Sequence, residues 1–293
     1  MTTIGVFAPS GPVIERVRLK TAISWLRRDG FNVVLAKNLF EIKGWTAGSK
    51  SRRASQMNNM LRNPKIDILM AATGGEGASH ILADIDYAAA KKKIVMGLSD
   101  ISAILNAIHA KTKAITYHGP VICYGIVDPK NPRKIEKITY KRFLDFAKRG
   151  KTSIEPVKKF KIIKKGKGKG LLTGGNLEVF SRLIGTEYFP KGKIILLFED
   201  LHAEIQDINR TLYQFRNAGI FKRTAGIILG NFEHITDNDK EVSIRIIEKV
   251  FLDSAKGYSF PIISGAMFGH MIPNSIIPIG KMAEIAGEKA RIL

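Results

Sequence analysis

The chain has 293 residues, of which 45% are hydrophobic and 25% charged, a balance typical of a folded globular protein and not of a disordered chain. A single cysteine, Cys123, excludes a disulfide framework within one chain, and neither a secretory signal nor a membrane-length apolar run is visible, so we expect a cytoplasmic protein with no membrane partner. The formal net charge of +21 permits attraction to nucleic acid, anionic lipid or acidic substrates.

The first half of the chain alternates short apolar runs with amphipathic stretches. Strands are predicted at 4–7, 31–35, 66–72, 94–96 and 114–117, and helices at 14–29, 50–62, 77–91 and 101–109. Ile14 and Val17 begin the predicted apolar face of the first helix. This alternation predicts an α/β fold with a doubly wound, mostly parallel sheet. Functional loops collect at the carboxyl ends of such strands, where Ser10, Gly74 and Ser99 lie.

A basic segment from 148 to 169 interrupts this alternation. It carries ten basic residues against one acidic residue, Glu155. Phe160 is its only aromatic side chain, whereas surfaces that bind nucleic acid by base stacking carry several. We interpret the segment as a solvated linker or surface strand, with an anion-binding surface as the alternative, and we expect no nucleic-acid partner.

The second half of the chain has more strand character. Apolar runs at 194–198 and 226–229 predict strands, and 206–215 predicts a helix. We expect three parts: an N-terminal α/β domain at 1–125, a basic linker region at 126–168, and a C-terminal domain with more strand character at 169–293.

The motif Gly97-Leu98-Ser99-Asp100 lies between a predicted strand and a predicted helix. A serine on such a sharp turn exposes its hydroxyl, and the backbone N–H of the next residue points to where an oxyanion would form. The same residues also fit a plain glycine turn in which Ser or Asp caps the helix.

The motif Thr73-Gly74-Gly75-Glu76-Gly77 also follows a predicted strand and opens a predicted helix. Glycines at this position let backbone N–H groups face an anion, although a structural turn fits equally well. The motif does not match the dinucleotide-binding or Walker patterns, so we expect no nucleotide cofactor.

Two further candidates lie in the second half. Glu199 and Asp200 end a predicted strand, and His270 lies in a loop-like stretch. Taken singly, they fit a solvated turn and a structural histidine. Together with Ser99 they give the order Ser, Glu, His, which supplies a nucleophile, an orienting acid and a base. The other histidines lack metal-ligand spacing and the chain has one cysteine, so we expect no metal site.

Several motifs follow one another along nearly the whole chain. They are Ala8-Pro9-Ser10-Gly11-Pro12, Gly74-Gly75, Gly97-Leu98-Ser99-Asp100-Ile101-Ser102, Thr116-Tyr117-His118-Gly119-Pro120, Gly174-Gly175-Asn176-Leu177, Gly185-Thr186, Leu197-Phe198-Glu199-Asp200, and Gly269-His270 with Pro278-Ile279-Gly280. In this order they resemble the LD-carboxypeptidases, serine peptidases that include murein tetrapeptide carboxypeptidases and microcin C self-immunity peptidases.

The resemblance implies a role for each residue of the candidate triad. Ser99 would be the nucleophile, His270 the base and Glu199 the orienting acid, with oxyanion donors from the backbone N–H groups of Gly75 and Asp100. It also implies an N-terminal α/β domain and a smaller, strand-rich C-terminal domain with the triad at their junction, and a homodimer. We expect no cofactor.

The implied substrate is a small peptide, contacted by Ser10, Gly74 and Glu76. The favoured substrate is a murein tetrapeptide that loses its C-terminal D-alanine. Thr73 and Glu76 replace an arginine and a tyrosine that murein-directed members often carry, so a peptidyl- or aminoacyl-nucleotide amide is the alternative. A non-catalytic basic binding protein on the same fold is a second alternative.

Overall fold

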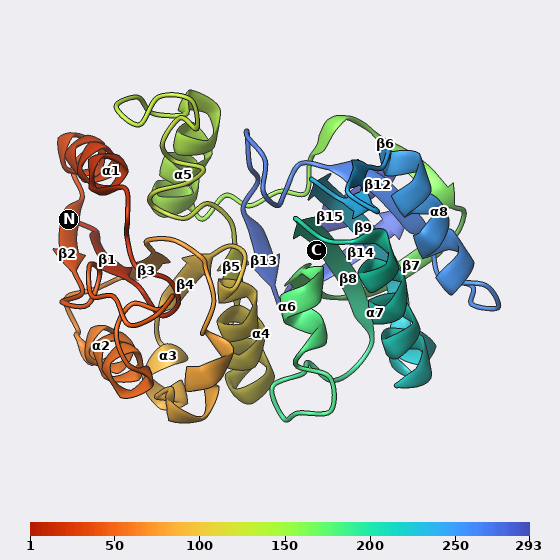
Figure 1. Cartoon of the computed structure of the whole chain (residues 1–293), viewed down its shortest axis with the longest axis horizontal. Coiled ribbons are helices and arrows are strands. Elements are labelled where there is room, and N and C mark those ends of the chain that lie inside the picture. The colour runs from red at the N-terminus through yellow and green to blue at the C-terminus, as the bar shows by residue number, and fades with distance from the viewer.

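The structure is a computed structural model that describes residues 1–293. Its first sheet has six strands in the order β13-β5-β4-β3-β1-β2 (Figure 1). These strands are β1 (Thr3–Phe7), β2 (Asn32–Leu35), β3 (Ile68–Ala71), β4 (Ile94–Gly97), β5 (Thr116–His118) and β13 (Ile277–Ile279). Strands β1 to β5 pair in parallel, as predicted, and β13 pairs antiparallel with β5. Every residue of β3 is buried, which explains its continuous apolar sequence.

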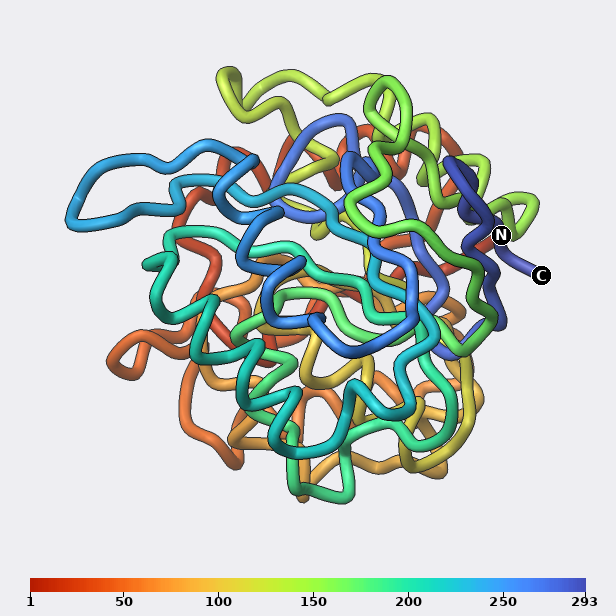
Figure 2. Tube along the Cα trace, turned by 90° about the vertical axis from the view of Figure 1, so that its right-hand side faces the viewer, coloured from red at the N-terminus to blue at the C-terminus, as the bar shows by residue number.

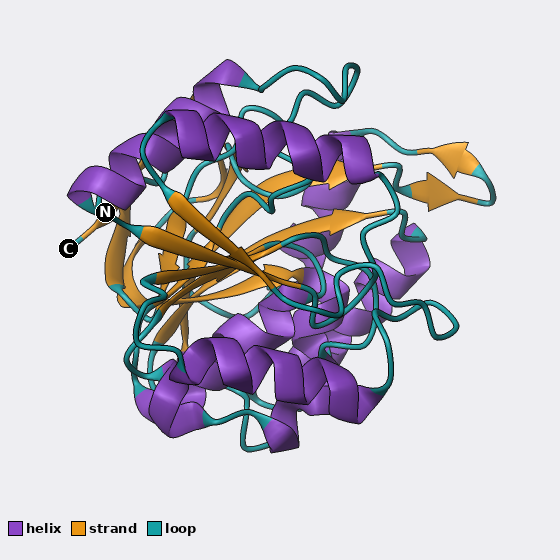
Figure 3. Cartoon of the chain, turned by 90° about the vertical axis from the view of Figure 1, so that its left-hand side faces the viewer, coloured by secondary structure: helices purple, strands orange, loops and turns teal.

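Helices cover both faces of the first sheet. They are α1 (Arg16–Arg28), α2 (Lys50–Arg62), the 3₁₀ helix η1 (Ser79–Asp84), α3 (Tyr87–Ala90), α4 (Ile101–Thr112) and α5 (Lys137–Arg149). Figure 3, in which the N-terminal half faces the viewer, shows helices above and below the strands. The first and fifth helices pack together on one face, where the rings of Trp25 and Tyr140 lie 6.0 Å apart. On the other face, α2 contacts α3, and α3 contacts α4.

Two predicted helices differ in detail from those observed. Helix α1 begins at Arg16, so Ile14 lies before it, and both Ile14 and Val17 are exposed; Ala22 and Leu26 are buried as predicted, together with Leu19. The predicted helix at 77–91 is interrupted at Ile85, which is extended. Asp86 then caps the start of α3, because its side chain accepts the N–H of Ala89 at 3.0 Å. This local hydrogen bond starts a new helix, and the preceding helical segment ends before Ile85.

The second sheet has seven strands in the order β15-β14-β7-β8-β9-β12-β6. They are β6 (Pro156–Lys164), β7 (Lys167–Asn176), β8 (Ile194–Leu201), β9 (Thr224–Glu233), β12 (Ile262–Ala266), β14 (Met282–Ala286) and β15 (Lys289–Ile292). Its helices are α6 (Leu177–Ser181), α7 (Ile205–Asn217), η2 (Ile220–Arg223) and α8 (Ile244–Ser254). A hairpin of β10 (Thr236–Asp237) and β11 (Lys240–Glu241) projects from the body (Figures 2 and 3). The predicted α/β fold with a strand-rich C-terminal part is confirmed.

The segment at 126–168 is ordered, although we expected a basic linker. It contains α5, which buries Tyr140, Phe143 and Phe146 along one side, and β6, the edge strand of the second sheet. Lysines on β6 such as Lys158 and Lys159 are exposed, and charged side chains on an edge strand disfavour pairing with another chain. The basic stretch is therefore largely a surface strand.

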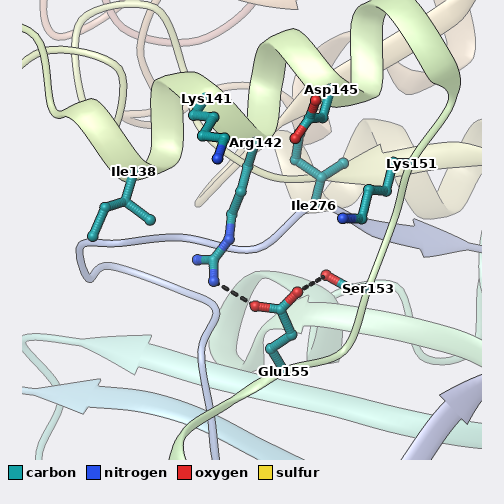
Figure 4. Close-up of a pocket in the computed structure, with 8 residues that line it drawn as sticks. All are labelled: Ile138, Lys141, Arg142, Asp145, Lys151, Ser153, Glu155 and Ile276. Carbon is teal, nitrogen blue, oxygen red and sulfur yellow. Dashed lines mark hydrogen bonds and ion pairs between the residues drawn. The ribbon is translucent and has the colours of Figure 1, made fainter.

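A polar contact joins α5 to the start of the second sheet (Figure 4). Arg142 forms an ion pair with Glu155, which also accepts the hydroxyl of Ser153 at 2.7 Å. These residues line a cavity of about 210 Å³ together with Ile276, from the segment that leads into β13. The two halves of the chain are thus interlocked, because β13 returns from the C-terminal half to complete the first sheet.

No helix combines the length and apolar character needed to cross a membrane.

Candidate active site

Ser99 lies on the turn between β4 and α4. Its φ of 65° is unusual for a residue with a side chain and marks a strained turn. Gly97 makes the turn possible, since a Cβ there would lie 2.5 Å from Cγ2 of Ile101 on the first turn of α4. Gly74 lies over the serine, where a Cβ would come within 3.0 Å of the Ser99 Oγ. The elbow predicted from the sequence is therefore present, with a glycine loop packed against it.

The side chain of Asp100 holds the loops around the elbow together. Its Oδ2 accepts the hydroxyl of Ser10 at 2.6 Å and the N–H of Ala78 at 2.8 Å. Burial raises the pKa of this carboxyl, and the two hydrogen bonds oppose that effect. Ser10 is fully buried and lies outside the lining of the large cavity described below, so its position is that of a support for the loop.

The glycine loop presents free backbone donors. Gly75 has a φ of 113°, and a Cβ there would lie 2.9 Å from Cα of Gly11. The N–H groups of Gly75 and Asp100 donate to no group of the protein, and Gly75 is exposed at the cavity. Gly74 and Gly75 line the cavity, whereas Glu76 is exposed and does not.

His270 is held by Glu199 from the neighbouring strand end. Nδ1 of His270 lies 2.6 Å from Oε2 of Glu199, and its backbone N–H donates to the same oxygen at 3.2 Å. Glu199 is fully buried, while the His270 side chain is 19% exposed and reaches the cavity. Gly269 permits this approach, because a Cβ there would lie 2.7 Å from Cβ of Glu199.

Strand periodicity explains why Glu199, and not Asp200, meets the histidine. Along β8, Phe198 packs toward the helices and Leu197 toward the opposite face. Asp200 shares the side of Phe198, accepting from Nδ2 of Asn176 at 2.9 Å. Burial raises the pKa of Asp200 to about 6, and the charge of Glu199 acts in the same direction. The carboxyl group of Glu199 therefore contacts His270, whereas that of Asp200 contacts Asn176.

Burial works against charge on both members of the Glu199–His270 pair. At Glu199 the charge and hydrogen bonds of His270 outweigh burial and hold the pKa of the carboxyl below its usual range. At His270 burial is outweighed by the charge and hydrogen bond of Glu199, with further contributions from Asp200 and Glu233, so its pKa is raised. Glu199 is therefore ionised at neutral pH, and His270 is more basic than a free imidazole.

Two polar residues of α4 connect the halves of the site: Ser102, the last residue of the elbow motif, and Asn106, to which the sequence motifs gave no role. Asn106 Nδ2 donates to the carbonyl of Gly174 at 2.7 Å, and Ser102 Oγ accepts the N–H of Asn176 at 3.2 Å. Their four-residue spacing among the otherwise apolar residues 101–108 was the available signal, since it places both on one face.

Ser99 and His270 open onto one cavity of about 700 Å³. Its lining residues are Thr73, Gly74, Gly75, Leu98, Ser99, Val121, Tyr124, Gly125, Val127, Pro129, Leu201, Asn231, Glu233, Gly269, His270, Met271, Ile272 and Asn274. Glu233 is the one carboxylate among them, and none of the 47 lysines and arginines is present. The strong positive charge of the protein therefore lies away from this cavity.

This arrangement is suited to nucleophilic chemistry. A histidine held by a buried carboxylate can take a proton from a hydroxyl, and free N–H groups can stabilise an oxyanion. No cluster of three or more histidine, cysteine, aspartate or glutamate side chains is placed to hold a metal ion.

Comparison with known proteins identifies the family. Residues 4–119 match the sequence model of the LD-carboxypeptidase N-terminal domain, and residues 169–285 match that of the C-terminal domain. The chain is 32% identical over 297 residues to a probable murein peptide carboxypeptidase of Bacillus subtilis, covering 99% of this chain and 91% of that protein. It is 28% identical over 310 residues to the microcin C7 self-immunity protein MccF of Escherichia coli, covering 95% of this chain and 88% of that protein.

The fold agrees with this assignment. It matches the crystal structure of muramoyltetrapeptide carboxypeptidase from Oxalobacter formigenes with a TM-score of 0.81 and 26% sequence identity, over 99% of this chain and 98% of that one. The resemblance seen in the sequence motifs is confirmed by both domain matches and by the shared fold. The chain belongs to the LD-carboxypeptidase family of peptidases.

Proposed function

We propose that this protein is a serine carboxypeptidase that converts a murein tetrapeptide to the tripeptide and D-alanine. The observation that carries the proposal is the convergence of Ser99, on its strained turn, and His270, held by buried Glu199, on one cavity. The similarity to murein peptide carboxypeptidases supports the substrate class.

The reaction proceeds in two halves. His270 takes the proton of Ser99 as Oγ attacks the carbonyl carbon before the terminal D-amino acid, and Glu199 stabilises the imidazolium that forms. The N–H groups of Gly75 and Asp100 stabilise the oxyanion. His270 then gives its proton to the departing amine, which leaves as D-alanine. Water, activated by the same histidine, hydrolyses the Ser99 ester and releases the tripeptide.

One observation favours a second candidate function, the hydrolysis of a peptidyl- or aminoacyl-nucleotide amide. The cavity has apolar walls that include Tyr124 and Ile272, against which the planar base of such a leaving group would pack. The similarity to the microcin C7 self-immunity protein points the same way.

The test is incubation of the purified protein with free murein tetrapeptide, followed by mass spectrometry. We expect the loss of one alanine, and a fall of about 10⁶ in turnover for Ser99→Ala. Ser79→Ala, at an exposed serine beginning η1, is the matched control and should leave turnover unchanged.

A fluorophosphonate label separates the candidates. Labelling of Ser99 without cleavage of the tetrapeptide would favour the nucleotide-amide substrate. Absence of both labelling and cleavage would exclude the serine mechanism and leave a binding protein on this fold.

A further inference from the structure

A second histidine, His118, lies behind the Glu199–His270 pair. It ends β5 and is fully buried. Its ring is 5.7 Å from that of Phe268 in an edge-on arrangement, and a Cβ on Gly175 would lie 2.9 Å from its Cδ2. The imidazole is therefore enclosed by residues of both halves of the chain. The reaction described above does not use it.

The polar atoms of His118 have no hydrogen-bond partner. Both ring nitrogens are buried and unpaired, and so is Oε1 of Glu199, the carboxylate oxygen that His270 does not use. Nε2 of His118 lies 4.0 Å from this Oε1. Leaving a buried donor or acceptor unpaired is costly, and more so for a charged group. Two unpaired atoms of complementary character thus face each other inside the protein.

We propose that His118 is a positioning residue whose Nε2–H donates a hydrogen bond to Oε1 of Glu199. The inference rests on the proposed function, because it assigns His118 a role in orienting the acid that serves His270. A shift of about 1 Å brings the two atoms from their present separation to hydrogen-bond distance. Glu199 is then held between two histidines, of which one moves protons and the other stays neutral.

The electrostatics of the pocket are consistent with a neutral donor. Burial lowers the pKa of His118 to about 4, with the charge of His270 acting in the same direction and Glu199 opposing. The remaining charged groups that bear on His270 are Asp200 and Glu233. His118 therefore carries one ring proton at neutral pH, and Nε2 is the nitrogen that faces an acceptor.

The position of His118 in the sheet gives this bond a mechanical consequence. His118 pairs in register with Gly97 on β4, two residues before Ser99. Glu199 and His270 come instead from the C-terminal half. A bond from His118 to Glu199 therefore fixes the acid and its histidine relative to the strand that carries the serine.

The test compares His118→Phe, which keeps a flat ring without a donor, with His118→Gln, whose amide N–H can reach the position of Nε2. The pKa of His270 is read directly by NMR titration of ¹⁵N-histidine-labelled protein, without substrate. Loss of the donor concentrates negative charge on Glu199, which stabilises the imidazolium of His270. We expect the pKa of His270 to rise in His118→Phe and to return toward the wild-type value in His118→Gln.

Kinetics provide the second readout. The acid limb of kcat/KM should move to higher pH in His118→Phe, and kcat should fall about tenfold, the loss that corresponds to one hydrogen bond to a charged group. KM should change little, since His118 does not line the cavity. An unchanged pKa of His270 in His118→Phe, or a His118→Gln variant that behaves like His118→Phe, would overturn the proposal.

The wild-type protein supplies a measurement that does not depend on any variant folding. Its ¹⁵N spectrum should show His118 with the proton on Nε2 and no titration near neutral pH. A proton on Nδ1, or a titrating His118, would contradict the proposed bond. Because these spectra need no substrate, they separate the role of His118 from the proposed reaction, which fluorophosphonate labelling of Ser99 tests independently.

Discussion

Asn106 on α4 is hydrogen-bonded to both backbone groups of Gly174 on β7. Its Nδ2 donates to the carbonyl at 2.7 Å and its Oδ1 accepts the N–H at 3.1 Å, as a neighbouring strand would do. The same Oδ1 accepts the hydroxyl of Thr173 at 2.7 Å. One buried side chain therefore replaces a missing ladder partner at the junction of the two halves. The helix that follows Ser99 is bound in this way to the sheet that carries Glu199.

Replacing Asn106 by alanine should affect both stability and activity. Asn106→Ala leaves the buried Gly174 backbone groups unpaired, so the free energy of unfolding should fall by about 2–4 kcal/mol in a urea titration. The rate of Ser99 labelling should fall as well, because the two halves of the site lose their common anchor. Lys111→Ala, on the same helix, removes a surface ion pair with Glu187 and should change stability by less than about 1 kcal/mol. Equal stability of the two variants would show that the contact is not structural.

The local elements of the site could be predicted from the sequence. The turn at Ser99 follows from a glycine between a strand pattern and a helix pattern, and the loop at Gly74 follows from the same logic. Glu199 and His270 could be proposed because chain order and the family motifs point to them. Each of these signals is contained in a few neighbouring residues.

The contacts between distant segments could not be predicted. We predicted no strand at 277–279, and these residues give no sign that β13 pairs with the first sheet, because that pairing depends on the fold of both halves. The burial of Ser10 depends on Asp100, ninety positions away. The pattern of the basic segment at 148–169 could not distinguish a linker from a surface strand, because its lysines mask the alternation of β6, an edge strand with one solvated side.

The pH dependence of activity should follow the ionisation of His270. The base must be neutral, so kcat/KM should fall as the pH drops through a pKa that lies above the ordinary histidine value of about 6.5. Glu199→Gln removes the charge that raises this pKa, so the acid limb should move to lower pH while kcat falls by about 10³ or more. Asp200→Asn should shift the limb less, in the same direction. An acid limb that stays in place in Glu199→Gln would assign the titration to another group.

Glu233 should select substrates by charge. It is the one carboxylate that lines the cavity, its side chain is 46% exposed, and no lysine or arginine lines the cavity with it. An ammonium group on the residue before the scissile bond would therefore bind more tightly than an uncharged replacement. Glu233→Gln should raise KM for the ammonium-bearing tetrapeptide about tenfold and leave KM for the uncharged analogue unchanged. An equal change in KM for both peptides would show that Glu233 does not select substrates by charge.

Gly269 and Gly257 form a matched pair that separates backbone strain from crowding of the site. Both have positive φ, 106° and 86°, so alanine is strained at either position. A Cβ at Gly257 meets nothing within 4 Å, whereas at Gly269 it would lie 2.8 Å from Oε2 of Glu199, the atom that holds His270. Gly257→Ala should cost about 1 kcal/mol of stability and leave kcat unchanged.

Gly269→Ala should instead lose activity beyond any loss of stability, because Glu199 must move and release the imidazole. Denaturant titration and the rate of Ser99 labelling, measured on both variants, give the comparison. If Gly269→Ala kept the wild-type labelling rate, the hydrogen bond between Glu199 and His270 would not be needed to activate the serine. If both variants lost labelling equally, backbone strain in the C-terminal half would explain the loss of labelling. The close contact between residue 269 and Glu199 would then have no effect of its own.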